Sequence, residues 1–141
     1  DQAAILSAIA DGYIGAVASD HCPQAPRLKT CEFEDAAPGS VSFESTFSMV
    51  LEAVSGDVLK ACALLSSGPR RILGLPPATM KVGDPADLVR FAPSERWTLR
   101  IDQLVASEKN WPKDERECFG KVKNTWVSGQ MVFGACASGR T

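Results

Sequence analysis

Asp20 and His21 are adjacent and follow an apolar run at residues 13–18. A carboxylate and an imidazole are the side chains of this chain best suited to bind a metal ion or to transfer a proton. His21 is the only histidine among 141 residues, and the five cysteines are irregularly spaced without a CxxC pair. The chain by itself therefore predicts neither a His-rich metal site nor a structural zinc site. Two interpretations of Asp20 stay open: it caps a turn, or it is the last ligand of a site built mostly from residues elsewhere.

The composition is that of an ordinary soluble globular chain. Hydrophobic residues make up 45% of the sequence and the formal net charge is −2, which fits about one domain. This charge is too small and too evenly spread to indicate nucleic acid or an anionic membrane as a partner. No apolar run approaches the roughly 18 residues that span a bilayer. The odd number of cysteines indicates reduced thiols and a cytoplasmic location.

The elements that must position Asp20 follow from the spacing of apolar residues. Residues 2–10 have helical spacing and end at an Asp-Gly pair, which is a good helix stop. Residues 13–18 predict a continuous apolar strand, of the kind that parallel sheets bury on both faces. Residues 21–42 predict a long loop, and loops of this length are usually active-site loops or disordered segments.

Two helices are expected after the loop. The first begins near Phe43 and has one apolar face. The second is capped by Asp57 and stops at Gly68-Pro69, and a short helical turn ended by Gly74 follows it. The apolar face of the first helix comprises Phe43, Phe47, Val50, Leu51 and Val54.

A small antiparallel unit is expected in the second half of the chain, where short alternating stretches are joined by turn-rich connections. Residues 106–120 interrupt it with a charged and irregular stretch. The last two strands form a hairpin around Ser128-Gly129. The predicted strands are residues 80–82, 88–91, 97–101, 122–127 and 130–133.

This order of elements predicts an α/β fold, with the last part of a TIM barrel and a small antiparallel β domain beside it. A strand that ends in an acidic residue and leads to a helix is the βα unit of a TIM barrel, where catalytic groups occupy that position. We assign residues 1–75 to the barrel, 76–134 to the β-sandwich domain and 135–141 to a loose tail. Because the chain begins inside a helix and its apolar strand has no parallel neighbour, we expect a piece of a longer protein.

Six stretches, in order, resemble motifs of the dihydroorotases, which are cyclic amidohydrolases of the amidohydrolase superfamily. Residues 18–24, ASDHCPQ, resemble the TDHAPH element that follows the eighth barrel strand in that family. Residues 32–46 look like its EF…APPGIxGLET motif, and residues 66–76 are similar to TxNPARILGL. The β unit resembles the family's composite β domain at residues 81–93, 96–110 and 119–133. Hydantoinases and allantoinases share part of this pattern.

The resemblance implies a zinc-dependent hydrolase that converts dihydroorotate to and from N-carbamoyl-aspartate in pyrimidine biosynthesis. One or two zinc ions would be held mostly by residues absent from this chain, which we therefore expect to be inactive alone. Asp20 matches the family's strand-eight aspartate, a catalytic residue that contacts the metal or its water and carries a proton to the leaving nitrogen.

The resemblance also implies which residues contact the substrate. Gln24 stands where the family has a second histidine that holds the substrate carboxylate, and an amide side chain there carries no charge. Gln24 could equally be a solvated loop residue. Pro38 and Gly39 match the Pro-Gly pair whose backbone faces the pyrimidine ring, where a glycine permits close approach.

Two further hypotheses stay open. One is a hydantoinase or allantoinase, which the uncharged Gln24 keeps in view. The other is a dihydroorotase-like scaffold without catalysis, which would hold a partner such as aspartate transcarbamoylase. A homo-oligomer is expected in either case, and an isolated fragment without function is the remaining alternative.

The neighbours of Asp20 have simpler interpretations. We expect His21 to have a structural or supporting role, and Cys22 to be a small buried thiol. Glu44 is expected to cap the helix that it opens. Residues 109–117 are expected to form a solvated loop.

Overall fold

The computed structural model describes residues 1–112 and 114–134. Its first helix, α1 (Gln2–Ala10), has the predicted bounds and buries Ile9. After Gly12, which has a φ of +82°, the chain is extended as far as Asp20. The loose tail predicted at residues 135–141 lies outside the described residues.

The strand predicted at residues 13–18 does not form, because no parallel strand of the described chain lies beside it. Instead, this extended segment packs on a helix: the Val17 amide donates to the Leu64 carbonyl at 3.0 Å. The contact is close enough to require a glycine, since a Cβ at Gly68 would lie 1.9 Å from the Gly15 carbonyl oxygen.

The helical part contains α2 (Phe43–Ala53), α3 (Val58–Cys62), a π-helical turn (Ala63–Ser67) and α4 (Gly68–Ile72). The predicted cap of α3 is confirmed, since Asp57 accepts a hydrogen bond from the Lys60 amide at 3.0 Å. The predicted stop at Gly68-Pro69 is wrong. The proline lies in the first turn of α4, where its missing N–H is not needed, and the π-helical turn carries the chain into it.

The β unit is an antiparallel sheet in the order β1-β2-β3, made of β1 (Leu88–Leu99), β2 (Arg116–Val127) and β3 (Gln130–Phe133). The predicted hairpin around Ser128-Gly129 is confirmed: both residues have positive φ, +49° and +80°, as a type I′ turn requires. Three parts of the strand prediction are wrong. Residues 80–82 lie exposed outside the sheet, and part of the stretch expected to be irregular belongs to β2. The strands predicted at residues 88–91 and 97–101 are one strand, β1, which ends at Leu99 before a short 3₁₀ helix (Ile101–Gln103).

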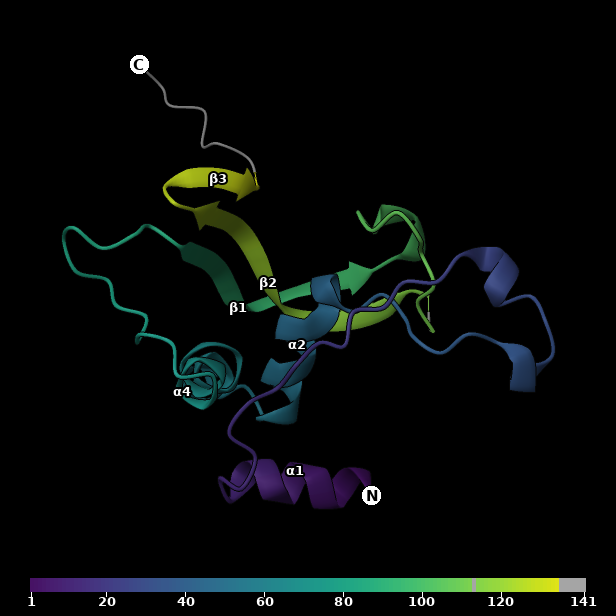
Figure 1. Ribbon diagram of the computed structural model, residues 1–141, viewed down its shortest axis with the longest axis horizontal. Helices are drawn as coiled ribbons and strands as arrows, with labels where there is room; N and C mark the ends of the chain where they lie inside the picture. The colour runs from purple at the N-terminus through teal and green to yellow at the C-terminus, as the bar shows by residue number, and fades with distance from the viewer. Residues whose placement is uncertain (113, 135–141) are drawn as a thin grey trace.

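The core consists of two hydrophobic clusters. Helix α2 packs against β2 (Figure 1). One cluster joins α1, α2 and α3 around Leu51, which is fully buried. The other joins the end of the loop to the sheet and is made of Val41, Leu99, Leu104 and Cys118. Phe43 does not share the buried face of α2 as predicted, because it is 67% exposed and stacks on the His21 ring instead.

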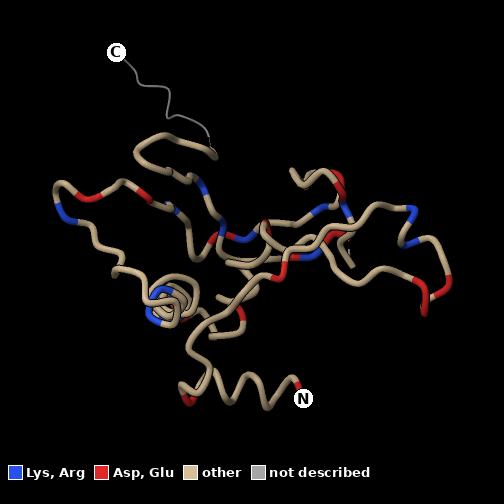
Figure 2. The backbone as a smooth tube through the Cα atoms, in the orientation of Figure 1, with Lys and Arg blue, Asp and Glu red and all other residues tan. Residues whose placement is uncertain are grey.

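The loop at residues 21–42 contains two short 3₁₀ helices (Pro26–Leu28 and Phe33–Asp35) and extends away from the helices and the sheet (Figure 1). Charges of both signs are dispersed along the chain, in keeping with the small net charge of −2 (Figure 2). Within residues 1–112 and 114–134, no helix is long and apolar enough to cross a membrane.

Candidate functional site

Asp20 lies at the end of the extended segment, where the loop begins. Its φ is +49°, in the left-handed region that aspartate tolerates better than most residues. Its side chain is exposed, and no hydrogen bond or ion pair holds it in the described part of the chain. The carboxylate therefore caps no turn there and has both oxygens available.

His21 joins the start of the loop to the N-terminus of α2. Its Nδ1 accepts hydrogen bonds from the amides of Ser42 at 3.1 Å and Phe43 at 3.3 Å. Its ring stacks on Phe43 with the centroids 4.0 Å apart and the planes 5° apart. An accepting Nδ1 assigns the ring hydrogen to Nε2. His21 thus caps α2 in place of a side chain from the helix itself, which is a structural role as expected.

The two arms of the loop meet directly after Asp20. His21 and Ser40 form a parallel bridge, and the Cys22 amide donates to the Ser40 carbonyl at 3.0 Å. Gly39 has a φ of +111°, and a Cβ there would lie 2.5 Å from the Cys22 carbonyl oxygen. The close contact between the two arms therefore explains why residue 39 is a glycine, whether or not a ligand also approaches it.

The expected burial of Cys22 is wrong. Its thiol is exposed, because no other segment of the described chain covers this side of the loop, and it accepts a hydrogen bond from Gln24 Nε2 at 3.1 Å. Gln24 and Gly39 are half-buried, whereas Pro38 is exposed. The three residues assigned to substrate binding therefore lie on the two arms of one loop.

Asn110 is the residue that sequence reasoning missed. It was expected in a solvated loop, but its side chain is half-buried and connects the two arms. Its Oδ1 accepts from the Gln24 amide at 2.9 Å and its Nδ2 donates to the Gly39 carbonyl at 2.9 Å. Its own carbonyl accepts from the Val41 amide at 3.2 Å. The only signal in the sequence was its place at the end of the stretch 96–110, which resembles a family motif.

Glu44 also binds a segment that is far away in the sequence. It lies in the first turn of α2, as predicted, but its Oε1 accepts from the amides of Val105 at 2.8 Å and Ala106 at 3.2 Å. The expected capping of its own helix is therefore wrong, because the carboxylate accepts from two backbone amides of another segment instead. These two hydrogen bonds hold the segment that precedes Asn110 against the first turn of α2.

The described residues do not by themselves form a metal site, since they contain no group of three or more His, Cys, Asp or Glu side chains that could hold an ion. Asp20 offers one carboxylate, which suits one ligand of a site whose other ligands come from elsewhere.

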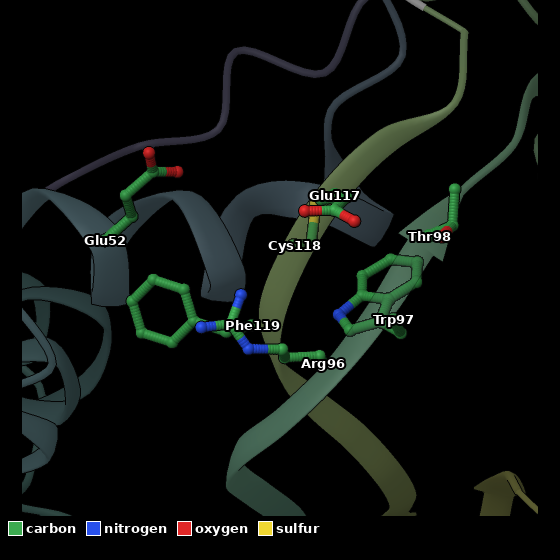
Figure 3. Close-up of a pocket in the computed structure, with 7 residues that line it drawn as sticks. All are labelled: Glu52, Arg96, Trp97, Thr98, Glu117, Cys118 and Phe119. Carbon is green, nitrogen blue, oxygen red and sulfur yellow. The ribbon is translucent and has the colours of Figure 1, made fainter.

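A cavity of about 260 Å³ lies elsewhere, between α2 and the strands β1 and β2 (Figure 3). None of the residues assigned to metal or substrate lines it. The buried thiol at its wall, Cys118, has a raised pKa, chiefly because burial disfavours the thiolate. The cavity is lined by Glu52, Arg96, Trp97, Thr98, Glu117, Cys118 and Phe119.

Comparison with known proteins places the chain among the cyclic amidohydrolases. No family model matches it. A dihydroorotase of Citrifermentans bemidjiense is 35% identical over 138 residues, which are 96% of this chain and 32% of the relative. A dihydroorotase of Anaeromyxobacter dehalogenans is 35% identical over 135 residues, 94% of this chain and 31% of the relative. The chain thus spans about a third of the length of the curated relatives that it matches.

Solved structures agree on the fold. A D-hydantoinase (dihydropyrimidinase) from Thermus sp. superposes with a TM-score of 0.81 at 24% identity, over 95% of this chain and 31% of that one. Another D-hydantoinase gives a TM-score of 0.82 at 19% identity, over 94% and 31%. These neighbours are TIM-barrel amidohydrolases. Over nearly its whole length the chain is therefore similar to the C-terminal part of dihydroorotases in sequence and to that of D-hydantoinases in fold.

Proposed function

We propose that the chain supplies the last catalytic aspartate and the substrate-side loop of a dihydroorotase-type enzyme, which interconverts dihydroorotate and N-carbamoyl-aspartate. The observation that carries this proposal is Asp20: an exposed carboxylate without a partner, held in left-handed backbone where the loop begins. Residues 1–75 belong to the hydrolase barrel and residues 76–134 to the composite β domain. The 35% identity to dihydroorotases supports this assignment.

Zinc is the metal that the family resemblance implies, and Asp20 fits it as one oxygen ligand among ligands from outside this chain. When bound, zinc lowers the pKa of a water molecule so that hydroxide is available near neutral pH. The described residues supply too few ligands to bind zinc alone, and we therefore propose that the chain by itself is inactive.

Asp20 is the proton carrier of the proposed reaction. The water oxygen attacks the ring amide carbonyl, and Asp20 takes the proton that the water loses. The carbon–nitrogen bond then breaks, and Asp20 delivers this proton to the leaving nitrogen. A carboxylate with both oxygens free suits this role, because neither oxygen is engaged by the described residues.

The loop binds the substrate on the side of Gln24, Pro38 and Gly39. Gln24 offers an amide that can donate hydrogen bonds but carries no charge. This observation favours a second candidate, a hydantoinase-type activity, because hydantoin has no carboxylate to be held by a charged residue. The hydantoinase structures support only the fold of this alternative, since they are less than 25% identical.

A chimera tests the proposal. In it, this chain replaces the matching segment of the Citrifermentans bemidjiense dihydroorotase, and hydrolysis of dihydroorotate and of hydantoin is measured. We expect turnover of dihydroorotate and a loss of about 10²–10⁴-fold in kcat for Asp20→Asn. Asp11→Asn is the matched control, because Asp11 is an exposed aspartate at the end of α1. It should keep full activity.

Circular dichroism and zinc content show whether the chimera is folded and loaded. A folded, zinc-loaded chimera that hydrolyses neither substrate would refute an enzymatic role and favour a scaffold. Turnover of hydantoin alone would favour the second candidate. Full activity of Asp20→Asn would remove Asp20 from the mechanism.

A further inference from the structure

We infer that Asn110 is a positioning residue that clamps the two arms of the substrate-side loop from the β unit. Its side-chain amide uses an acceptor and a donor at once, toward the Gln24 amide and the Gly39 carbonyl, each at 2.9 Å. These are two of the residues assigned to substrate contact. That assignment rests on the proposed function, whereas the clamp itself rests on the geometry.

The chemistry of asparagine suits this position. One arm presents an N–H and the other a C=O, so the bridging group must accept on one side and donate on the other. A carboxylate can only accept when ionised, and an apolar side chain would leave both half-buried backbone groups without partners. Asn110 therefore fixes the distance between the arms at the loop's base, where Gln24 and Gly39 lie.

The segment that carries Asn110 is itself held in place. Glu44 accepts from the amides of Val105 and Ala106, and Lys109 Nζ donates to the Asp102 carbonyl at 2.8 Å. Leu104 is buried in the cluster beside the sheet, with Trp111 packed against it. The clamp is thus attached to a fixed support outside the loop, and the β unit determines where the substrate-side residues lie.

Amide hydrogen exchange on the full chain tests the clamp, because Asn110 holds two amides by different groups. Its side chain accepts from Gln24, whereas its backbone carbonyl accepts from Val41. In Asn110→Ala we expect the Gln24 amide to exchange about tenfold faster, since one hydrogen bond is lost. The Val41 amide should exchange at its original rate.

Two further variants make the test specific. Glu44→Ala is the matched control, because it removes side-chain hydrogen bonds to Val105 and Ala106 in the same segment without touching the loop. Leu104 and Trp111 still anchor that segment in the cluster beside the sheet, so Gln24 should stay protected. Asn110→Asp keeps the acceptor for Gln24 but loses the donor to Gly39. It should therefore leave Gln24 protected and speed exchange at Cys22, whose amide is bonded to the Gly39 side of the loop through Ser40.

Unchanged protection of Gln24 in Asn110→Ala would overturn the clamp. Equal acceleration at Gln24 and Val41 would also overturn it, because this would show general loosening. If Asn110→Ala does not fold, the same decision is taken on Asn110→Asp: faster exchange at Cys22 with Gln24 protected supports the clamp, and any other pattern refutes it.

The chimera allows KM to be measured, which a purely structural role of Asn110 would leave unchanged. We expect Asn110→Ala to raise KM about tenfold with a smaller change in kcat, in contrast to the kcat loss in Asp20→Asn. Unchanged KM in a variant whose Gln24 amide has lost protection would refute a role in substrate positioning. An inactive wild-type chimera would count against the proposed function, while the exchange data still decide on the clamp.

Discussion

His21→Ala should destabilise the chain by about 1.5–2 kcal/mol, because it removes a helix cap and an aromatic contact together. The imidazole Nδ1 accepts from the amides of Ser42 and Phe43, and the loss of an N-terminal cap typically costs about 1 kcal/mol. The ring also stacks on Phe43, and such a pair contributes about 0.5–1.5 kcal/mol. Since Phe43 is 67% exposed, the lower part of that range applies.

Urea unfolding followed by tryptophan fluorescence measures this loss, since Trp97 and Trp111 pack against the cluster beside the sheet. His21→Asn separates the two contributions, because its side-chain oxygen can still accept at the helix N-terminus while the ring contact is gone. We expect this variant to lose only about 0.5–1 kcal/mol. Phe43→Ala should lose the ring contact, keep the cap, and add little when combined with His21→Asn.

Two outcomes would refute this reasoning. If His21→Asn is as unstable as His21→Ala, the accepting nitrogen does not contribute a cap. If His21→Ala loses less than about 0.5 kcal/mol, neither contact contributes as the geometry implies. A change in the slope of unfolding free energy against urea would instead indicate a change in the surface exposed on unfolding.

Three more predictions concern the core, the thiols and one carboxylate. Leu51→Ala should lower the free energy of unfolding by about 2–5 kcal/mol, because Leu51 is fully buried; a loss below 1 kcal/mol in urea would contradict that packing. At pH 8, iodoacetamide should modify exposed Cys22 at least about tenfold faster than buried Cys118, whose pKa is raised by burial, and peptide mass spectrometry compares the two. The hydrogen bond from Thr79 is the largest cause that lowers the pKa of Asp84. In Thr79→Val this pKa should rise toward 3.8, so the variant should lose less stability than the wild type as the pH falls through that value; an NMR titration of the carboxyl group that shows no rise would refute it.

Local signals in the sequence predicted local structure well. The Asp57 cap and the Ser128-Gly129 turn each depend on a few adjacent residues, and both are confirmed. The strand at residues 13–18 was wrong because a strand needs partners, and the described chain has no parallel strand to pair with it. The helix stop predicted at Gly68-Pro69 was wrong for a related reason. A proline ends a helix from its interior but is tolerated in its first turn, and the sequence does not show which turn Pro69 occupies.

The candidate site shows the same difference between residues recognised from their sequence neighbours and residues that act through distant contacts. Asp20 could be singled out because it follows an apolar run and lies within the stretch 18–24, which resembles a family motif. Asn110 could not, because it contacts the loop across 86 residues of sequence. Glu44 contacts Val105 across 61 residues, and its helix-opening position indicated only a local cap. Hydrogen bonds between distant segments leave no periodic pattern in the sequence.

The backbone conformation of Asp20 connects these distant contacts to function. A non-glycine residue with positive φ costs about 1–3 kcal/mol and persists only when its surroundings fix it. The surroundings that do so lie directly after it: His21 is bonded to the start of α2, and Gln24 is bonded to Asn110. The segment before Asp20 is also held, because the Val17 amide donates to the Leu64 carbonyl. The Asp20 carboxylate itself makes no contact in the described chain, so its position follows from the backbone on both sides. A side chain left free in this way is available for the proposed role of metal ligand and proton carrier, whereas a turn cap would have used it.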